Sequence, residues 1–106
     1  MSYRVSISSI AERDIASAVD YVEFALKNPV AADHLLDVVE TRLASLSEMP
    51  SRTRVVDDPV LSSWRIRCIA IENYLAFYVV DDALQAVTVV RFLHQKSNWN
   101  QILRLT

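Results

Sequence analysis

The side chains best suited to phosphate chemistry in this sequence are arginines and a histidine in its second half. Arg65 and Arg67 are two residues apart in an apolar stretch, Arg91 lies inside another, and His94 follows three residues later. Guanidinium groups presented from one rigid strand can bind phosphate oxygens in a bidentate manner. An imidazole can exchange a proton near neutral pH. These residue types predict a site for phosphate or nucleic-acid chemistry.

Each of these side chains also has a purely structural interpretation. If one face of a sheet is in water, Arg65 and Arg67 lie on that solvated face. His94 would then be a partly exposed side chain at the end of a strand. Trp99 could stack on a nucleobase, and it could equally anchor the terminal segment to the core. Both interpretations stay open on sequence alone.

Arg91 is the hardest of these residues to assign to the scaffold. It lies inside the apolar run Val87–Leu93, so its charge must reach water, a carboxylate such as that of Glu72, or an anionic ligand. In a regular strand, Arg91 and His94 point to opposite faces. A site that uses both residues therefore requires the strand to end or bulge near Leu93.

Composition excludes several common classes of enzyme. The chain has 106 residues and no glycine, so it has none of the glycine-rich loops that bind nucleotides. His34, Cys68 and His94 lack metal-ligand spacing, so we expect neither a metal nor a cofactor. A single cysteine cannot form an internal disulfide, which favours the cytoplasm. The longest uncharged runs have eight residues, so we expect no contact with a membrane.

Charge is distributed unevenly along the chain. The formal net charge is −2, and residues 12–48 carry eight carboxylates against three basic side chains. The remainder, from Met49 onward, is mildly basic. Any surface that binds anions is therefore expected in the second half of the chain.

The apolar spacing predicts the elements that must position these side chains. Alternation over Tyr3–Ser8 predicts a first strand. Ser9 followed by Glu12 matches a capping box, so a helix is expected to begin there. Asn28-Pro29 should end it and cap a second helix, which stops before Pro50. Two helices joined by so short a turn form an antiparallel hairpin.

After Pro50 the apolar period changes to that of strands. The predicted strands are Thr53–Asp57, Trp64–Ile71, Leu75–Val80 and Val87–Leu93. Asn73 is the best residue for a left-handed turn position in a chain without glycine. Ser97–Leu105 predicts a short C-terminal helix. We therefore expect one α+β domain over residues 1–106, with an N-terminal strand and a helix hairpin packed on a three- to four-stranded antiparallel sheet.

Several short segments, taken in order and spacing, resemble one protein family over nearly the whole chain. They are Tyr3–Val5, Ala11–Ile15, Asp20–Val22, Ala31-Ala32, Leu43–Pro50, Arg65–Arg67, Asn73–Tyr78, Val89–His94 and Trp99 with Ile102-Leu103. Together these segments resemble the RelE/ParE family, the toxins of bacterial type II toxin–antitoxin systems. The fold of that family is a helix hairpin against an antiparallel sheet, which is also the fold that the periodicity predicts.

The resemblance implies a partner and two alternative activities. The partner is a cognate antitoxin whose extended or helical segment wraps the toxin. RelE-like members are metal-independent ribonucleases that act on the ribosome and its mRNA, whereas ParE-like members inhibit DNA gyrase. For RNA cleavage, the resemblance implies the catalytic candidates His94, Arg91 and Arg67 and the substrate-binding candidates Arg65, Lys96 and Trp99.

The sequence departs from the RelE-like pattern in two respects. Lys96 is the only lysine after Lys27, and no tyrosine follows Tyr78. A pI near 5.6 also gives little attraction toward RNA. We nevertheless predict the ribonuclease, because Arg91 and His94 are hard to explain as scaffold. The alternatives are a gyrase inhibitor, which would tolerate loss of His94, and an inactive member retained for antitoxin binding.

Overall fold

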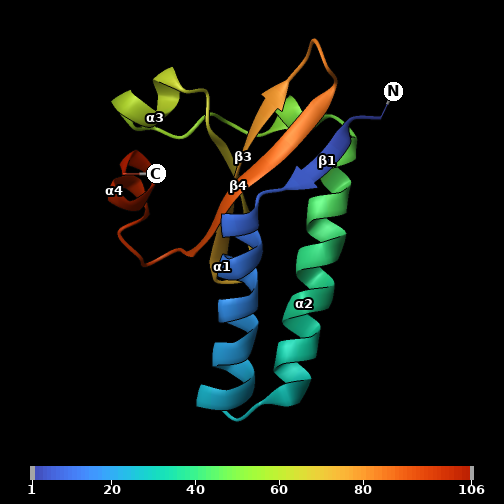
Figure 1. The fold of residues 1–106 in the computed structure, drawn as a ribbon, viewed down its shortest axis with the longest axis vertical. Helices are drawn as coiled ribbons and strands as arrows, with labels where there is room; N and C mark the ends of the chain where they lie inside the picture. The colour runs from blue at the N-terminus through green and yellow to red at the C-terminus, as the bar shows by residue number, and fades with distance from the viewer. Residues whose placement is uncertain (1, 106) are drawn as a thin grey trace.

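The computed structural model describes residues 2 to 105 as a four-stranded sheet with a long helix hairpin (Figure 1). The elements are, in chain order, β1 (Arg4–Ile7), α1 (Ser9–Asp20), a π-helical turn η1 (Tyr21–Ala25), α2 (Pro29–Ala44), the 3-10 turns η2 (Ser45–Ser47) and η3 (Pro50–Arg52), α3 (Pro59–Ser63), β2 (Arg67–Ile71), β3 (Tyr74–Asp81), β4 (Ala86–His94) and α4 (Trp99–Arg104). The α+β fold with a short C-terminal helix is therefore confirmed.

Side-chain caps fix where the two long helices begin. Asn28 Oδ1 accepts a hydrogen bond from the Ala31 N–H at 3.1 Å, so Asn28 caps α2 as predicted. Ser8 Oγ accepts from the Ala11 N–H at 3.0 Å, which makes Ser8 the cap of α1. The predicted cap, Ser9, is instead the first residue of α1. Either serine could supply the hydroxyl, and the extended backbone at Ser8 places its oxygen over the first turn.

The sheet has the strand order β1-β4-β3-β2. Strands β2, β3 and β4 form the predicted antiparallel meander. Strand β1 pairs with β4 in parallel, with Val5 opposite Val87, so the sheet is mixed and not wholly antiparallel. This pairing joins segments about eighty residues apart, and periodicity within each segment carries no signal for it.

Both faces of the sheet are covered. The α1–α2 hairpin packs on one face, over a main cluster that includes Leu35, Val39 and Tyr78. On the opposite face, α3 and α4 cover a smaller cluster centred on Phe77 and Leu103. The interpretation of a sheet with one face in water is therefore wrong, because two short helices close the second face.

The predicted strand Trp64–Ile71 forms only in its second half. Asp58 caps α3 in the preceding segment, and its Oδ1 accepts from the Leu61 N–H at 3.1 Å. The chain then turns through Arg65, whose φ of 58° lies in the left-handed region. The strand consequently begins at Arg67, and alternation of faces does not extend back to Trp64.

Two smaller expectations also differ from the structure. The predicted strand Thr53–Asp57 contributes a single bridge among the described residues, between Val55 and Arg67. At the β2–β3 turn, the left-handed residue is Glu72, with φ 55°, and not Asn73. No helix in residues 2 to 105 is both long and apolar enough to span a bilayer.

Candidate functional site

Arg91 is held in a nearly buried ion pair with Asp14 of α1. Its Nε donates to Asp14 Oδ2 at 2.7 Å and its Nη2 donates to Oδ1 at 3.0 Å. The two side chains are only 17% and 14% exposed, and Asp14 Oδ2 also accepts from the Phe92 N–H at 3.0 Å. Of the alternatives that the sequence left open for Arg91, the structure shows a carboxylate, that of Asp14, whereas Glu72 bonds to His34.

A bulge in β4 lies next to this ion pair. Tyr78 pairs with Val89 and Phe77 pairs with Arg91, so Val90 is an extra residue in the strand. The sequence required an interruption near Leu93 for a shared site, and the interruption occurs three residues earlier. One extra residue shifts which side chains face the hairpin, so Phe92 enters the main cluster.

Arg67 is occupied by the backbone of the segment that follows α2. Its Nη1 donates to the carbonyl oxygens of Thr53 and, at 3.3 Å, of Ser51. The neighbouring Tyr78 hydroxyl donates to the Pro50 carbonyl at 2.7 Å and bonds the Thr53 hydroxyl. Burial raises the pKa of Tyr78, so this phenol is a neutral hydrogen-bond donor at physiological pH. Arg67 and Tyr78 together fix residues 50 to 53 against the sheet.

Arg65 and Trp99 lie on the face covered by α3 and α4. Arg65 is exposed in the left-handed turn after α3, and it does not form a pair with Arg67 on a common strand face. The Trp99 ring packs on Phe77, with centroids 5.3 Å apart and planes tilted by 35°. Trp99 belongs to the smaller cluster, which is the contact that the anchoring interpretation requires.

His94 is the exposed last residue of β4, and Lys96 lies in the turn that follows. The Lys96 N–H donates to His94 Nδ1 at 3.0 Å, and the imidazole meets the Tyr74 ring edge-on at a centroid distance of 5.2 Å. With Nδ1 accepting, the neutral imidazole carries its proton on Nε2. These are the two predicted site residues that face solvent at the end of the strand.

The structure does not bring Arg67 and His94 together. Arg67 pairs with Tyr78 on one side of β3, and His94 pairs with Tyr74 on the other. Their backbones are therefore about 13 Å apart along the strands and about 10 Å apart across them. Across residues 2 to 105, no three His, Cys, Asp or Glu side chains are grouped closely enough to hold a metal ion.

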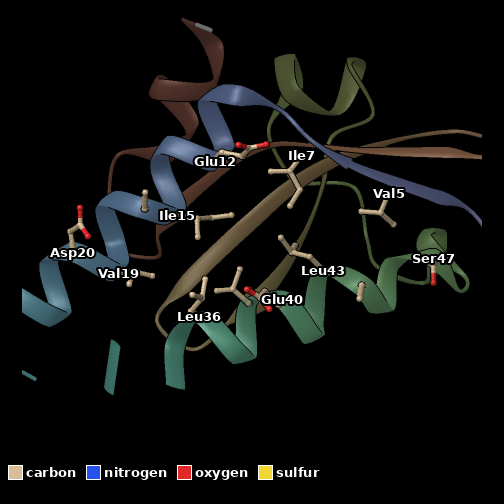
Figure 2. Close-up of a pocket in the computed structure, with 13 residues that line it drawn as sticks. Val5, Ile7, Glu12, Ile15, Val19, Asp20, Leu36, Glu40, Leu43 and Ser47 are labelled. Atoms are coloured by element: carbon tan, nitrogen blue, oxygen red, sulfur yellow. The ribbon is translucent and has the colours of Figure 1, made fainter. Parts of the chain in front are cut away.

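A large apolar groove lies between β1 and the helix hairpin, as Figure 2 shows. Its volume is about 840 Å³, and Ile15 of α1 faces Leu36 and Leu43 of α2 across it. The groove is lined by Val5, Ile7, Glu12, Ile15, Ala16, Val19, Asp20, Leu36, Val39, Glu40, Leu43, Ala44 and Ser47. Apolar side chains form its walls, and three carboxylates are its charged members.

Sequence reasoning missed this groove, although it identified the apolar stripes of both helices. Ile15, Val19, Leu36 and Leu43 all belong to stripes that predict core positions. Leu36 is exposed in the structure, because the two helices do not close over β1. A stripe pattern states which face is apolar, and it does not state whether the protein itself covers that face.

Comparisons with known proteins agree with this architecture. A family model described as "ParE toxin of type II toxin-antitoxin system, parDE" matches residues 5–99. Among solved structures, the chain is similar to the chromosomal ParDE system from P. aeruginosa, with a TM-score of 0.70 and 14% identity over 87% of this chain and 95% of that chain.

A second solved structure is similar over much the same length. It is the toxin–antitoxin complex RelBE2 from Mycobacterium tuberculosis, with a TM-score of 0.63 and 20% identity over 92% of this chain and 95% of that chain. At these identities, both likenesses establish the fold alone. No match was found among curated proteins.

Proposed function

The chain belongs to the ParE toxin family of type II toxin–antitoxin systems, and on this premise we propose that it acts by binding DNA gyrase and not by cutting RNA. The sequence favoured the ribonuclease, which needs Arg67, Arg91 and His94 on one open face. The observation that supports the binding mechanism is that both arginines are engaged by groups of the protein itself, Arg91 by Asp14 and Arg67 by loop carbonyls.

Electrostatics make the Arg91 pair a poor phosphate site. Cleavage of RNA needs proton transfer and cationic stabilisation within hydrogen-bond reach of the reacting phosphate. A phosphate approaching Arg91 would meet the Asp14 carboxylate, and in a nearly buried site that repulsion is weakly screened. Displacing Asp14 would also remove the acceptor of the Phe92 N–H. His94 ends the same strand as Arg91, whose guanidinium is already paired with Asp14.

We also propose that a cognate antitoxin occupies the groove between β1 and the hairpin. A concave apolar surface suits an amphipathic segment that lays its apolar side chains between α1 and α2. The carboxylates of Glu12, Asp20 and Glu40 would pair with lysine or arginine flanking those apolar residues. The antitoxin segment is therefore expected to be amphipathic and basic.

Induction of the toxin without antitoxin in bacteria tests the mechanism. The wild type and His94→Ala are expressed separately, transcript ends are mapped on translated messages, and purified toxin is added to a gyrase supercoiling assay. We expect growth arrest with intact messages and a DNA-damage response in both strains, and inhibition of supercoiling in vitro. His94 is exposed, so its removal leaves the fold intact.

Two other outcomes would replace this proposal. New cuts inside reading frames that disappear in His94→Ala would establish the ribonuclease and its histidine. Absence of growth arrest from a folded, soluble wild type would instead identify an inactive member retained for antitoxin binding.

A further inference from the structure

The turn between α1 and α2, at the tip of the helix hairpin, exposes several large apolar side chains. Tyr21, Phe24, Leu26 and Val30 are between 57% and 78% exposed. The tip lies at one end of the longest dimension of the molecule, 43 Å, and away from the sheet (Figure 1). Exposed apolar patches of roughly a few hundred Å² are the largest that a typical monomer carries, and they are often functional.

The backbone of the tip accounts for the exposure of Leu26. If the apolar spacing of Ile15, Val19 and Val22 continued in a regular α-helix, Ala25 and Leu26 would lie on the same buried stripe. The π-helical turn η1 (Tyr21–Ala25) shifts the phase of the helix, and both residues are exposed. Lys27 then adopts a left-handed conformation with φ 52°. Both features are unfavourable for ordinary residues, and π-helical turns occur frequently at functional sites.

The charged residues on either side of the hairpin turn are mostly acidic. Residues 17–37 carry four carboxylates and one lysine. A surface with an apolar centre and a negative rim is complementary to an apolar pocket that lysine and arginine surround. Proteins that handle DNA expose basic surfaces of this kind.

A folded target protein, an antitoxin segment and a second copy of this chain are the candidate occupants of this surface, and shape and area distinguish them. The tip is convex, so it fits a preformed pocket on a folded protein, whereas a wrapping antitoxin segment needs a concave surface such as the groove in Figure 2. A tip-to-tip dimer of this chain would bury well under the roughly 800 Å² per partner that stable interfaces use. It would also bring two negative rims together.

We propose that the tip, formed by Tyr21, Phe24, Leu26 and Val30, is the surface that binds the toxin's target protein. Phe24 and Leu26 insert into an apolar pocket with a basic rim, and the carboxylates around the tip guide the encounter. The inference rests on the proposed function, under which the target is DNA gyrase. It separates two surfaces on one hairpin, the groove for the antitoxin and the tip for the target.

Substitution at the tip tests this inference. Phe24→Ala/Leu26→Ala is compared with the wild type and with Leu84→Ala, a control at an exposed leucine in the β3–β4 turn that is 69% exposed, close to the 68% of Phe24. We expect the tip variant to inhibit gyrase supercoiling at least tenfold more weakly and to lose growth arrest. Leu84→Ala is expected to match the wild type. Helical circular dichroism, melting temperature and antitoxin affinity should be unchanged in both variants.

A charge reversal supplies an independent test. The first variant is Asp33→Lys, at an exposed aspartate in the first half of α2. The control is Asp57→Lys, which makes the same charge change at an exposed aspartate outside the hairpin. We expect Asp33→Lys to weaken gyrase inhibition several-fold at low salt, with a smaller difference at high salt, because screening reduces the contribution of rim charges. Asp57→Lys should leave inhibition unchanged.

The outcomes that overturn the inference differ from those that overturn the gyrase assignment. If the wild type arrests growth without inhibiting gyrase, the gyrase assignment fails, and loss of arrest in the tip variant still identifies the target surface. Arrest by the tip variant at wild-type potency refutes the inference whatever the target is. Loss of antitoxin binding with inhibition intact assigns the tip to the antitoxin, and a concentration-dependent dimer that the variant abolishes assigns it to a second copy.

Discussion

The two faces of the sheet are covered in different ways. One face carries two long helices over the main cluster, and the main cluster includes residues of all four strands. The other face carries α3 and α4, which have five and six residues. Helices this short are not stable alone, so the second layer depends on tertiary contacts. Those contacts are the packing of Leu103 and Trp99 and the ion pair between Arg104 and Asp58.

This difference explains why both strand arginines are bonded to other groups of the protein. A sheet covered on both faces offers a strand arginine few routes to water, so the guanidinium must find acceptors within the protein. Arg91 finds Asp14 under the hairpin, and Arg67 finds carbonyls at the sheet edge. The surfaces that we propose for partners are on the hairpin, in its groove and at its tip.

We expect the largest loss of stability from a substitution in the ion pair between α1 and β4. Asp14→Ala leaves the Arg91 charge without its carboxylate and the Phe92 N–H without its acceptor. We expect the free energy of unfolding to fall by about 3 kcal/mol or more, measured by chemical denaturation. The double variant Asp14→Leu/Arg91→Met should recover much of that loss, since it removes both charges. A double variant as unstable as Asp14→Ala would contradict the ion-pair explanation.

We expect a smaller loss of stability from a substitution on the sheet face that α3 and α4 cover. Leu103 is buried under α4, and Leu103→Ala should cost about 2 kcal/mol of unfolding free energy, near the lower end for a buried leucine. The short helix can relax or detach locally, which limits the cost. Hydrogen exchange should then show faster exchange of α4 amides while α1 and α2 remain protected. Leu105→Ala, at an exposed leucine, is the control and should change stability by under about 0.5 kcal/mol.

The smallest effect concerns the Asp58–Arg104 pair. Burial acts to raise the pKa of Asp58, but hydrogen bonds from the Leu61 N–H and from Arg104 outweigh it, and the pKa is lowered. A carboxylate with a lowered pKa in the folded state stabilises the protein above its unfolded pKa of about 3.9, and that contribution is lost as pH falls below it. Melting temperatures between pH 5 and 2 should therefore decline less steeply for Asp58→Asn than for the wild type. Parallel declines would show that this carboxylate is not coupled to folding.

Local patterns in the sequence predicted most of the secondary structure. The apolar stripes and Asn28-Pro29 located the helix hairpin, and alternation located β3 and β4 to within a residue or so. These signals succeed because helix and strand periods, caps and turns are encoded within about ten neighbouring residues. The short helix α3 was missed, since five residues provide little more than one turn of periodicity.

The candidate site depended on contacts between segments far apart in the chain. The sequence showed that Arg91 required a partner, but Asp14 lies 77 residues away, and only the packing of α1 on β4 selects it. The parallel pairing of β1 with β4 and the closure of the second face by α4 are of the same kind. Residue types and spacing thus determined which side chains could do chemistry. Tertiary packing decided which of them the protein uses for itself and which surfaces it leaves for partners, because burial makes an unpaired charge too costly to keep.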